Sequence, residues 1–226
     1  MRQMVLSLAP PSLPTLDNFV PGRNAELVSA LTALAGGARD ERFVYIWGLP
    51  GSGKTHLLKA LHGALSQRGI ATVMLSAPGE DAPVDTVVDA VLADDVDRWG
   101  APGQERLFNA YNGQRDDGGV LIAAGSVPPA RLQLRRDLVT RLGWGLVYQV
   151  HTLSDEEKMA AMTEHARARG FDLSPEVISY LLKRQARDLP ALLAILDALD
   201  CYSLENKRAV TVPLVRELLA ESARQL

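Results

Sequence analysis

The sequence predicts an α/β fold, in which a parallel five-stranded sheet flanked by helices is followed by a small all-α subdomain. Short apolar runs rich in β-forming residues alternate with segments of helical spacing up to about residue 150. From His151 onward the apolar runs stop and only segments of helical spacing remain. At 226 residues and 47% hydrophobic residues, the chain is long enough to bury a core for both parts.

Five segments have the length and composition of buried strands. They are residues 43–47, 71–75, 90–93, 120–124 and 146–150. A helix over residues 54–67 is expected to follow the first strand, because its leucines share one face and Gly69 can cap its end. Another helix is expected over residues 104–112. Strands separated by helices imply parallel pairing through right-handed crossovers.

The last third of the chain carries helix signals only. Ser154, with Glu157 three residues later, is a capping box that opens a helix running to about residue 170. Three more helices are expected: one with Ser174 as its cap and Pro175 in its first turn, one after Asp188 with Pro190 in its first turn, and one over residues 212–219.

The N-terminal segment is expected to be an extended tail, because Pro10, Pro11 and Pro14 remove backbone donors and restrict the residues before them. The expected domains are therefore this tail over residues 1–14, an α/β subdomain over 15–150 and a helical lid over 151–226.

Composition narrows the classes of function. The net charge is -3 and the pI about 5.8, which disfavours strong DNA binding by this chain alone. Neither a long apolar run nor a signal peptide is found, and Cys201 is the single cysteine. A cytoplasmic protein without disulfides or membrane association is expected.

A phosphate-binding loop is predicted between the first strand and the helix after it. The segment Gly48-Leu49-Pro50-Gly51-Ser52-Gly53-Lys54-Thr55 matches the pattern G-x-x-x-x-G-K-[ST]. This arrangement directs backbone N–H groups and the helix dipole at a phosphate. Lys54 is expected to reach the β and γ phosphates and the Thr55 hydroxyl to bind Mg²⁺.

A carboxylate at the end of a neighbouring strand is needed to hold the hydrated Mg²⁺. Asp94 follows four apolar residues and is assigned this role, while Asp95 is a candidate to orient the attacking water. Asp85, Asp89 and Asp97 do not follow such a run and are expected to be surface or loop groups.

With these pieces placed, nearly the whole chain resembles the AAA+ domain of the bacterial initiator DnaA and, more closely, the Hda-type family of short DnaA-homologous regulators. The resemblance rests on residues 16–20, on Asp94 with Asp95, on the run Arg141-Leu142-Gly143-Trp144-Gly145, and on the C-terminal helices. It implies bound ADP or ATP with Mg²⁺. The implied nucleotide-binding residues are Asn18, Phe19, Val20, Gly48, Pro50, Gly51, Ser52, Gly53, Lys54, Thr55, His56 and Arg187.

The resemblance also implies two partner-binding elements. Arg141 corresponds to the family's arginine finger, which reaches a neighbouring subunit's nucleotide; the alternative is that it caps a helix or pairs with a carboxylate. Gln3, Leu6 and Leu8 match the hexapeptide that docks on the DNA polymerase sliding clamp, where an amide and two apolar side chains enter preformed pockets.

Two positions depart from the family pattern. Ser126 stands where a polar or acidic sensor is usual, and Pro190 stands where a second sensor's arginine is expected. Arg187, one helical turn earlier, is a possible substitute for that arginine. Robust ATP hydrolysis by this chain is therefore not expected, and tightly held ADP is an equally good resting state.

These features favour a regulator of replication initiation that docks on the sliding clamp and promotes hydrolysis of DnaA-bound ATP through Arg141. Its contact with DNA would be indirect, and homo-oligomers are possible. Two alternatives remain open: a DnaA-like, nucleotide-switched recruiter at DNA, and a self-contained AAA+ ATPase or helicase loader.

Overall fold

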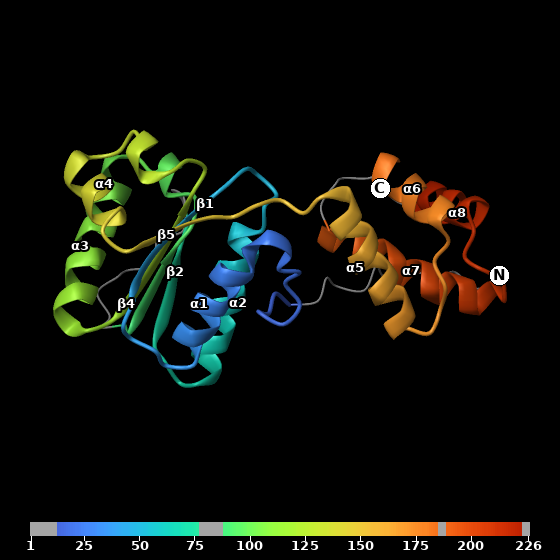
Figure 1. The fold of residues 1–226 in the computed structure, drawn as a ribbon, viewed down its shortest axis with the longest axis horizontal. Coiled ribbons are helices and arrows are strands. Elements are labelled where there is room, and N and C mark those ends of the chain that lie inside the picture. Colours follow the sequence, from blue (N-terminus) through green and yellow to red (C-terminus); the bar gives the residue numbers. More distant parts are fainter. Residues whose placement is uncertain (1–12, 77–87, 185–188, 223–226) are drawn as a thin grey trace. The chain divides into compact units, whose positions relative to one another are not determined.

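The structure is a computed structural model that describes residues 13–76, 88–184 and 189–222 (Figure 1). The chain divides into an α/β unit, Leu13–Thr152, and a second unit that contains the helices after Leu153. Each unit has its own hydrophobic core, so each is described by itself.

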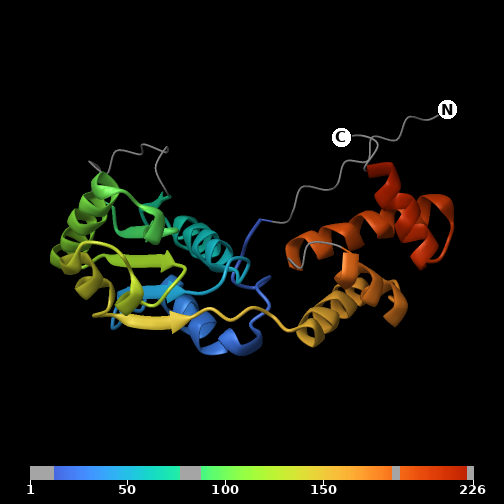
Figure 2. The same cartoon turned by 90° about the horizontal axis from the view of Figure 1, so that it is seen from above.

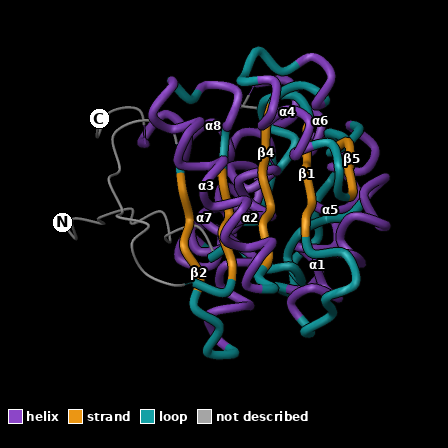
Figure 3. Tube along the Cα trace, turned by 90° about the vertical axis from the view of Figure 1, so that its left-hand side faces the viewer, coloured by secondary structure: helices purple, strands orange, loops and turns teal. Residues whose placement is uncertain are grey.

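The α/β unit contains the expected five-stranded parallel sheet. Its strands are β1 (Phe43–Trp47), β2 (Thr72–Leu75), β3 (Ala90–Ala93), β4 (Val120–Gly125) and β5 (Leu146–Gln149). They pair in the order β2-β3-β4-β1-β5, which Figure 3 shows from one edge of the sheet to the other. Every residue of β3 and β4 is buried, because helices cover both faces of a parallel sheet, and this explains their unbroken apolar runs.

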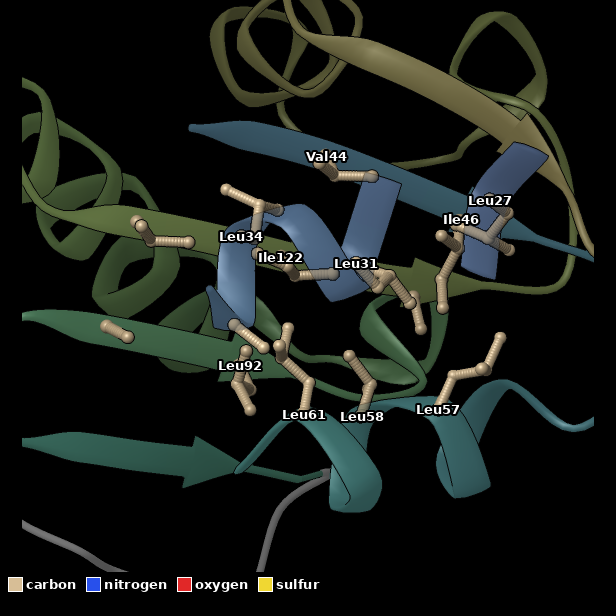
Figure 4. Close-up of a cluster of buried hydrophobic side chains, with 14 of the residues drawn as sticks. Leu27, Leu31, Leu34, Val44, Ile46, Leu57, Leu58, Leu61, Leu92 and Ile122 are labelled. Carbon is tan, nitrogen blue, oxygen red and sulfur yellow. The ribbon is translucent and has the colours of Figure 1, made fainter. Parts of the chain in front are cut away.

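Two layers of helices enclose the sheet. On one face, α1 (Ala25–Ala35) and α2 (Lys54–Gln67) pack leucines against Val44 and Ile46 of β1 (Figure 4). On the other face, α3 (Ala101–Asp117) and α4 (Arg136–Leu142) pack around Tyr45. Single turns of 3-10 helix lie at η1 (Gly22–Asn24), η2 (Val96–Arg98) and η3 (Pro129–Arg131).

The second unit consists, in its described part, of four helices (orange to red in Figure 2). They are α5 (Asp155–Ala168), α6 (Pro175–Arg184), α7 (Leu189–Asn206) and α8 (Val212–Ser222). The capping box at the start of α5 is confirmed, because the Ser154 N–H donates to Glu157 Oε2 at 2.7 Å and the Glu157 N–H donates to Ser154 Oγ at 3.2 Å. Within the described residues, none of the helices combines the length and apolar character that a bilayer crossing needs.

Candidate functional site

The glycine-rich loop lies between β1 and α2, as the sequence predicts, and its backbone leaves no room for larger residues at two positions. A Cβ on Gly48 would lie 2.3 Å from the Val150 carbonyl oxygen. Gly53 has a φ of 100°, in the left-handed region, and a Cβ there would lie 2.7 Å from the Phe19 ring. The glycines therefore let the loop fold closely between β5 and the segment before α1.

Two polar side chains of the loop point to an anion. Lys54 is only 7% exposed, and its Nζ donates to the carbonyl oxygens of Gly48 at 2.9 Å and Leu49 at 3.2 Å. Ser52 Oγ is buried and, among the described residues, has no hydrogen-bond partner. A phosphate group bound here would pair with the buried Lys54 ammonium, with the Ser52 hydroxyl that lacks a partner, and with the N-terminus of the 14-residue helix α2.

A hydroxyl and a carboxylate meet beside this loop. Thr55 Oγ1 donates to Asp94 Oδ2 at 2.6 Å, although the two residues are far apart in sequence. Asp94 is 6% exposed, and the Trp99 indole N–H donates to its carbonyl oxygen at 3.0 Å, which fixes the turn after β3. These hard oxygen donors fit Mg²⁺, which prefers one or two protein ligands together with phosphate oxygens. Thr55 and Asp94 would hold the ion.

Asp95 follows Asp94 in the chain, but its carboxylate contacts a different residue. Its N–H donates to Asp94 Oδ1 at 2.9 Å, and its φ of 48° places it in the left-handed region. Its carboxylate lies 3.4 Å from Arg98 at the surface of the η2 turn. The role of orienting a water therefore stays a prediction.

The segment before α1 covers the start of α2. Asn18 and Thr15 form reciprocal side-chain to backbone hydrogen bonds, with Asn18 Oδ1 accepting at 2.9 Å and Thr15 Oγ1 at 3.1 Å. The Phe19 and His56 rings are 5.5 Å apart, and His56 Nε2 lies 3.2 Å from the Thr15 carbonyl oxygen. This places Phe19 and His56 beside the phosphate loop, and half-buried Val20 follows in the chain.

Arg141 lies at the end of α4 and is held by α3. Its guanidinium sits 4.2 Å from the centre of the Phe108 ring, its Nε donates to Asn112 Oδ1 at 3.2 Å, and one Nη donates to the Asp137 carbonyl oxygen at 3.2 Å. Those two hydrogen bonds use two of the five N–H donors of a guanidinium. Trp144, 63% exposed, lies 5.8 Å from the same guanidinium.

The two positions that correspond to the family's sensors, Ser126 and Pro190, belong to different elements. Ser126 follows β4 and donates its hydroxyl to Asp97 Oδ2 at 2.6 Å, while its N–H donates to Asp97 Oδ1 at 3.1 Å. Asp97 lies in the η2 turn between β3 and α3, as expected of a loop group, and its carboxylate binds the residue that follows β4. Pro190 lies in the first turn of α7.

Four candidates lie outside the described residues, namely Gln3, Leu6, Leu8 and Arg187. Conversely, sequence reasoning did not select Phe108 and Asn112, the residues that hold Arg141. Their spacing of four places both on one face of a helix, which was the available signal, but nothing in the sequence connects that face to Arg141.

The sheet order, the phosphate loop after β1 and the carboxylate after β3 define the α/β unit as a P-loop nucleotide-binding fold of the AAA+ class. Solved structures agree with this fold. Domain III of the Thermotoga maritima replication initiation protein DnaA is similar over 92% of this chain and 95% of its own, with a TM-score of 0.71 and 21% identity. AMPPCP-bound DnaA from Aquifex aeolicus is similar over 88% of this chain and 69% of its own, with a TM-score of 0.69 and 22% identity. The Thermotoga maritima RuvB Holliday junction branch migration motor is similar over 94% of this chain and 72% of its own, with a TM-score of 0.63 and 19% identity.

The lid narrows this class. Residues 155–219, which span most of α5 to α8, match the family model described as the lid domain of Hda. The α/β unit thus has the fold of the DnaA structures, and the helices that follow it resemble the lid domain of Hda.

Proposed function

We propose that this protein binds adenine nucleotide with Mg²⁺ and regulates replication initiation negatively, by promoting hydrolysis of ATP bound to the initiator DnaA. In this proposal Arg141 acts in trans on the initiator's phosphates. The protein would work in the cytoplasm while Gln3, Leu6 and Leu8 dock it on the sliding clamp, so that its contact with DNA is indirect. Its own turnover of ATP would be slow.

This proposal rests on the position of Arg141. The arginine lies near the amino ends of the strands, whereas the phosphate loop of the same chain lies at their carboxyl ends. Gly48 follows the last residue of β1, whereas the turn after Arg141 approaches the first residue of β1: a Cβ on Gly145 would lie 2.0 Å from the Phe43 carbonyl oxygen. A five-residue strand at about 3.3 Å per residue spans roughly 15 Å. An arginine near the amino ends of the strands is therefore poorly placed to reach the nucleotide on its own chain. It is better placed to reach a nucleotide that a partner binds.

The contacts of Arg141 also support a catalytic task. The Phe108 ring and two hydrogen bonds hold the guanidinium in place before any partner arrives. A positioned guanidinium stabilises charge that develops on a transferred phosphoryl group, and it loses less side-chain entropy on binding than a freely rotating one. Exposed Trp144 beside it offers an aromatic contact to the same partner.

The decisive experiment measures hydrolysis of ATP held by the initiator, with this protein, clamp and DNA added in turn. Stimulation should require the complete mixture. Arg141→Ala should lower the stimulated rate by about a thousandfold, and Arg141→Lys should rescue it poorly because lysine lacks the planar fork. Both variants should keep the parental affinity for ADP.

Arg136→Ala is the matched control, because it removes an exposed arginine from the other end of α4. It should stimulate hydrolysis as the parent does. Equal stimulation by Arg141→Ala and the parent would show that Arg141 has only a structural role. ATP turnover by this protein alone, or on DNA without the initiator, would instead favour a self-contained ATPase.

A further inference from the structure

Asn24 ties the end of the α/β unit to the segment before α1. Its side chain makes two hydrogen bonds to one residue: the His151 N–H donates to Asn24 Oδ1 at 2.7 Å, and Asn24 Nδ2 donates to the His151 carbonyl oxygen at 3.0 Å. His151 precedes Thr152, the last residue of this unit. The link therefore fixes the backbone just before the chain enters the lid.

The surroundings of Asn24 show that its side chain serves this long-range contact. Asn24 stands at the N-cap position of α1, where an asparagine side chain commonly accepts a hydrogen bond from the first turn, but it makes no such bond here. It is only 3% exposed, whereas Arg23 and Ala25 on either side of it are exposed. Helix α1 thus lacks a side-chain cap, and both polar atoms of the buried amide bind the backbone of His151.

The phosphate loop lies between the two segments that Asn24 joins. A Cβ on Gly53 would lie 2.7 Å from the Phe19 ring, and Phe19 precedes the η1 turn that ends at Asn24. On the other side, a Cβ on Gly48 would lie 2.3 Å from the Val150 carbonyl oxygen. Val150 comes immediately before the residue that Asn24 binds. The loop, the segment before α1 and the end of the α/β unit therefore form a closed ring of contacts, which Asn24 completes.

We propose that Asn24 is a positioning residue that transmits nucleotide occupancy of the phosphate loop to the lid. The inference rests on the nucleotide site of the proposed function. A ligand that orders the loop restrains the two segments packed against it, and the Asn24 hydrogen bonds pass this restraint to His151, where the chain leaves for the lid. Without the amide, the loop still binds its ligand, but the backbone that leads to the lid is no longer held.

Asn24→Ala removes both hydrogen bonds, and its effect is measured as the distance distribution between two nitroxide labels, with and without ADP and Mg²⁺. One label is attached to Cys201, the single cysteine, which is exposed on α7, and the other to a Lys59→Cys substitution at an exposed position of α2. In the labelled parent, ADP should narrow the distribution. In Asn24→Ala this narrowing should be lost, while the affinity for ADP changes by about fivefold at most, the lower end of coupling between sites.

Asn109→Ala, which removes an exposed asparagine from α3, is the matched control and should respond to ADP as the parent does. Hydrogen exchange in the unsubstituted protein provides a second measurement that needs no variant to fold: the His151 N–H, which donates to Asn24, should exchange more slowly when ADP is bound. Parental narrowing in Asn24→Ala, or exchange at His151 that ADP does not slow, would overturn the inference while ADP binding stands. A parent that binds no ADP would refute the nucleotide site itself.

Discussion

At the scale of single residues, the support of Arg141 by Phe108 is the contact most closely tied to the proposed function. The guanidinium lies 4.2 Å from the ring centre, within the range of a cation–π interaction. A half-buried pair of this kind holds the arginine without neutralising its charge. The guanidinium is therefore kept in one place and yet stays positive for a phosphate.

We expect Phe108→Leu to weaken stimulation of the initiator's hydrolysis, because leucine fills much of the space but has no aromatic face. Loss of a cation–π interaction of about 0.5–2 kcal/mol corresponds to a decrease of roughly two- to thirtyfold in rate. The assay is the reconstituted hydrolysis described above. Nucleotide affinity and thermal stability of the variant should stay close to the parental values.

Arg135→Ala provides the control for this prediction. Arg135 also lies over the Phe108 ring, at 5.1 Å, but it pairs with Asp137 at the surface. Removing it changes the ring's surroundings and leaves Arg141 in place. If Arg135→Ala impaired stimulation as much as Phe108→Leu does, the effect would belong to the basic surface in general and not to the positioning of Arg141.

The sequence reveals residues of the site when they are contiguous and misses them when the fold brings them together. The loop from Gly48 to Thr55 is one uninterrupted motif, so its position was predictable without a structure. The pairing of Asp97 with Ser126 depends on the adjacency of β3 and β4 and on the tight turn at η2. Spacing along the chain contains no information on that turn, so Asp97 could be expected in a loop but its pairing with Ser126 could not be predicted.

At the scale of secondary structure, the strands were the most predictable elements. The runs that became β3 and β4 are short and apolar throughout, as expected when both faces are covered. Helix α1 was not among the expected elements, although Leu27, Leu31 and Leu34 recur at helical spacing. Helix α3 extends beyond the expected 104–112, since its first turn is Ala-Pro-Gly, its last turn is polar, and neither shows helical periodicity.

The link between α4 and β5 depends on a glycine. A Cβ on Gly145 would lie 2.0 Å from the Phe43 carbonyl oxygen, a separation that only backbone movement can relieve. Gly145→Ala should therefore destabilise the protein by about 2–4 kcal/mol, and it should also disturb Arg141 nearby. Thermal and urea unfolding measure the loss of stability.

Gly113→Ala is the matched comparison for this prediction. Gly113 lies inside α3, and a Cβ there meets nothing within 4 Å. Alanine in a helix interior should leave stability unchanged or raise it by about 0.5–1 kcal/mol. Opposite signs for the two glycine substitutions would support the steric account, whereas equal effects would contradict it.

At the scale of the whole molecule, nucleotide binding should be visible as added stability. A ligand at a hundredfold excess over its Kd stabilises the folded protein by about 2.7 kcal/mol, which for this size is an increase in Tm of roughly 5–10 °C. ADP with Mg²⁺ should produce this shift in the parent and not in Lys54→Ala, which lacks the ammonium at the loop. Differential scanning calorimetry gives the measurement.

Circular dichroism is the control for this comparison, because Lys54 is buried and its loss can affect folding as well as binding. The variant should keep the parental helix content and unfold cooperatively without nucleotide. An unchanged ADP-induced shift in Lys54→Ala would contradict the assignment of the loop as the phosphate site.

The exposure of Trp144 makes the protein its own optical probe. Of the three tryptophans in the chain, Trp99 is 4% exposed and Trp144 is 63% exposed. An indole in water emits at longer wavelength than a buried one and is open to a quencher such as iodide. A partner that covers Arg141 would also cover Trp144, so docking would be seen as a blue shift and a loss of quenching without any attached label.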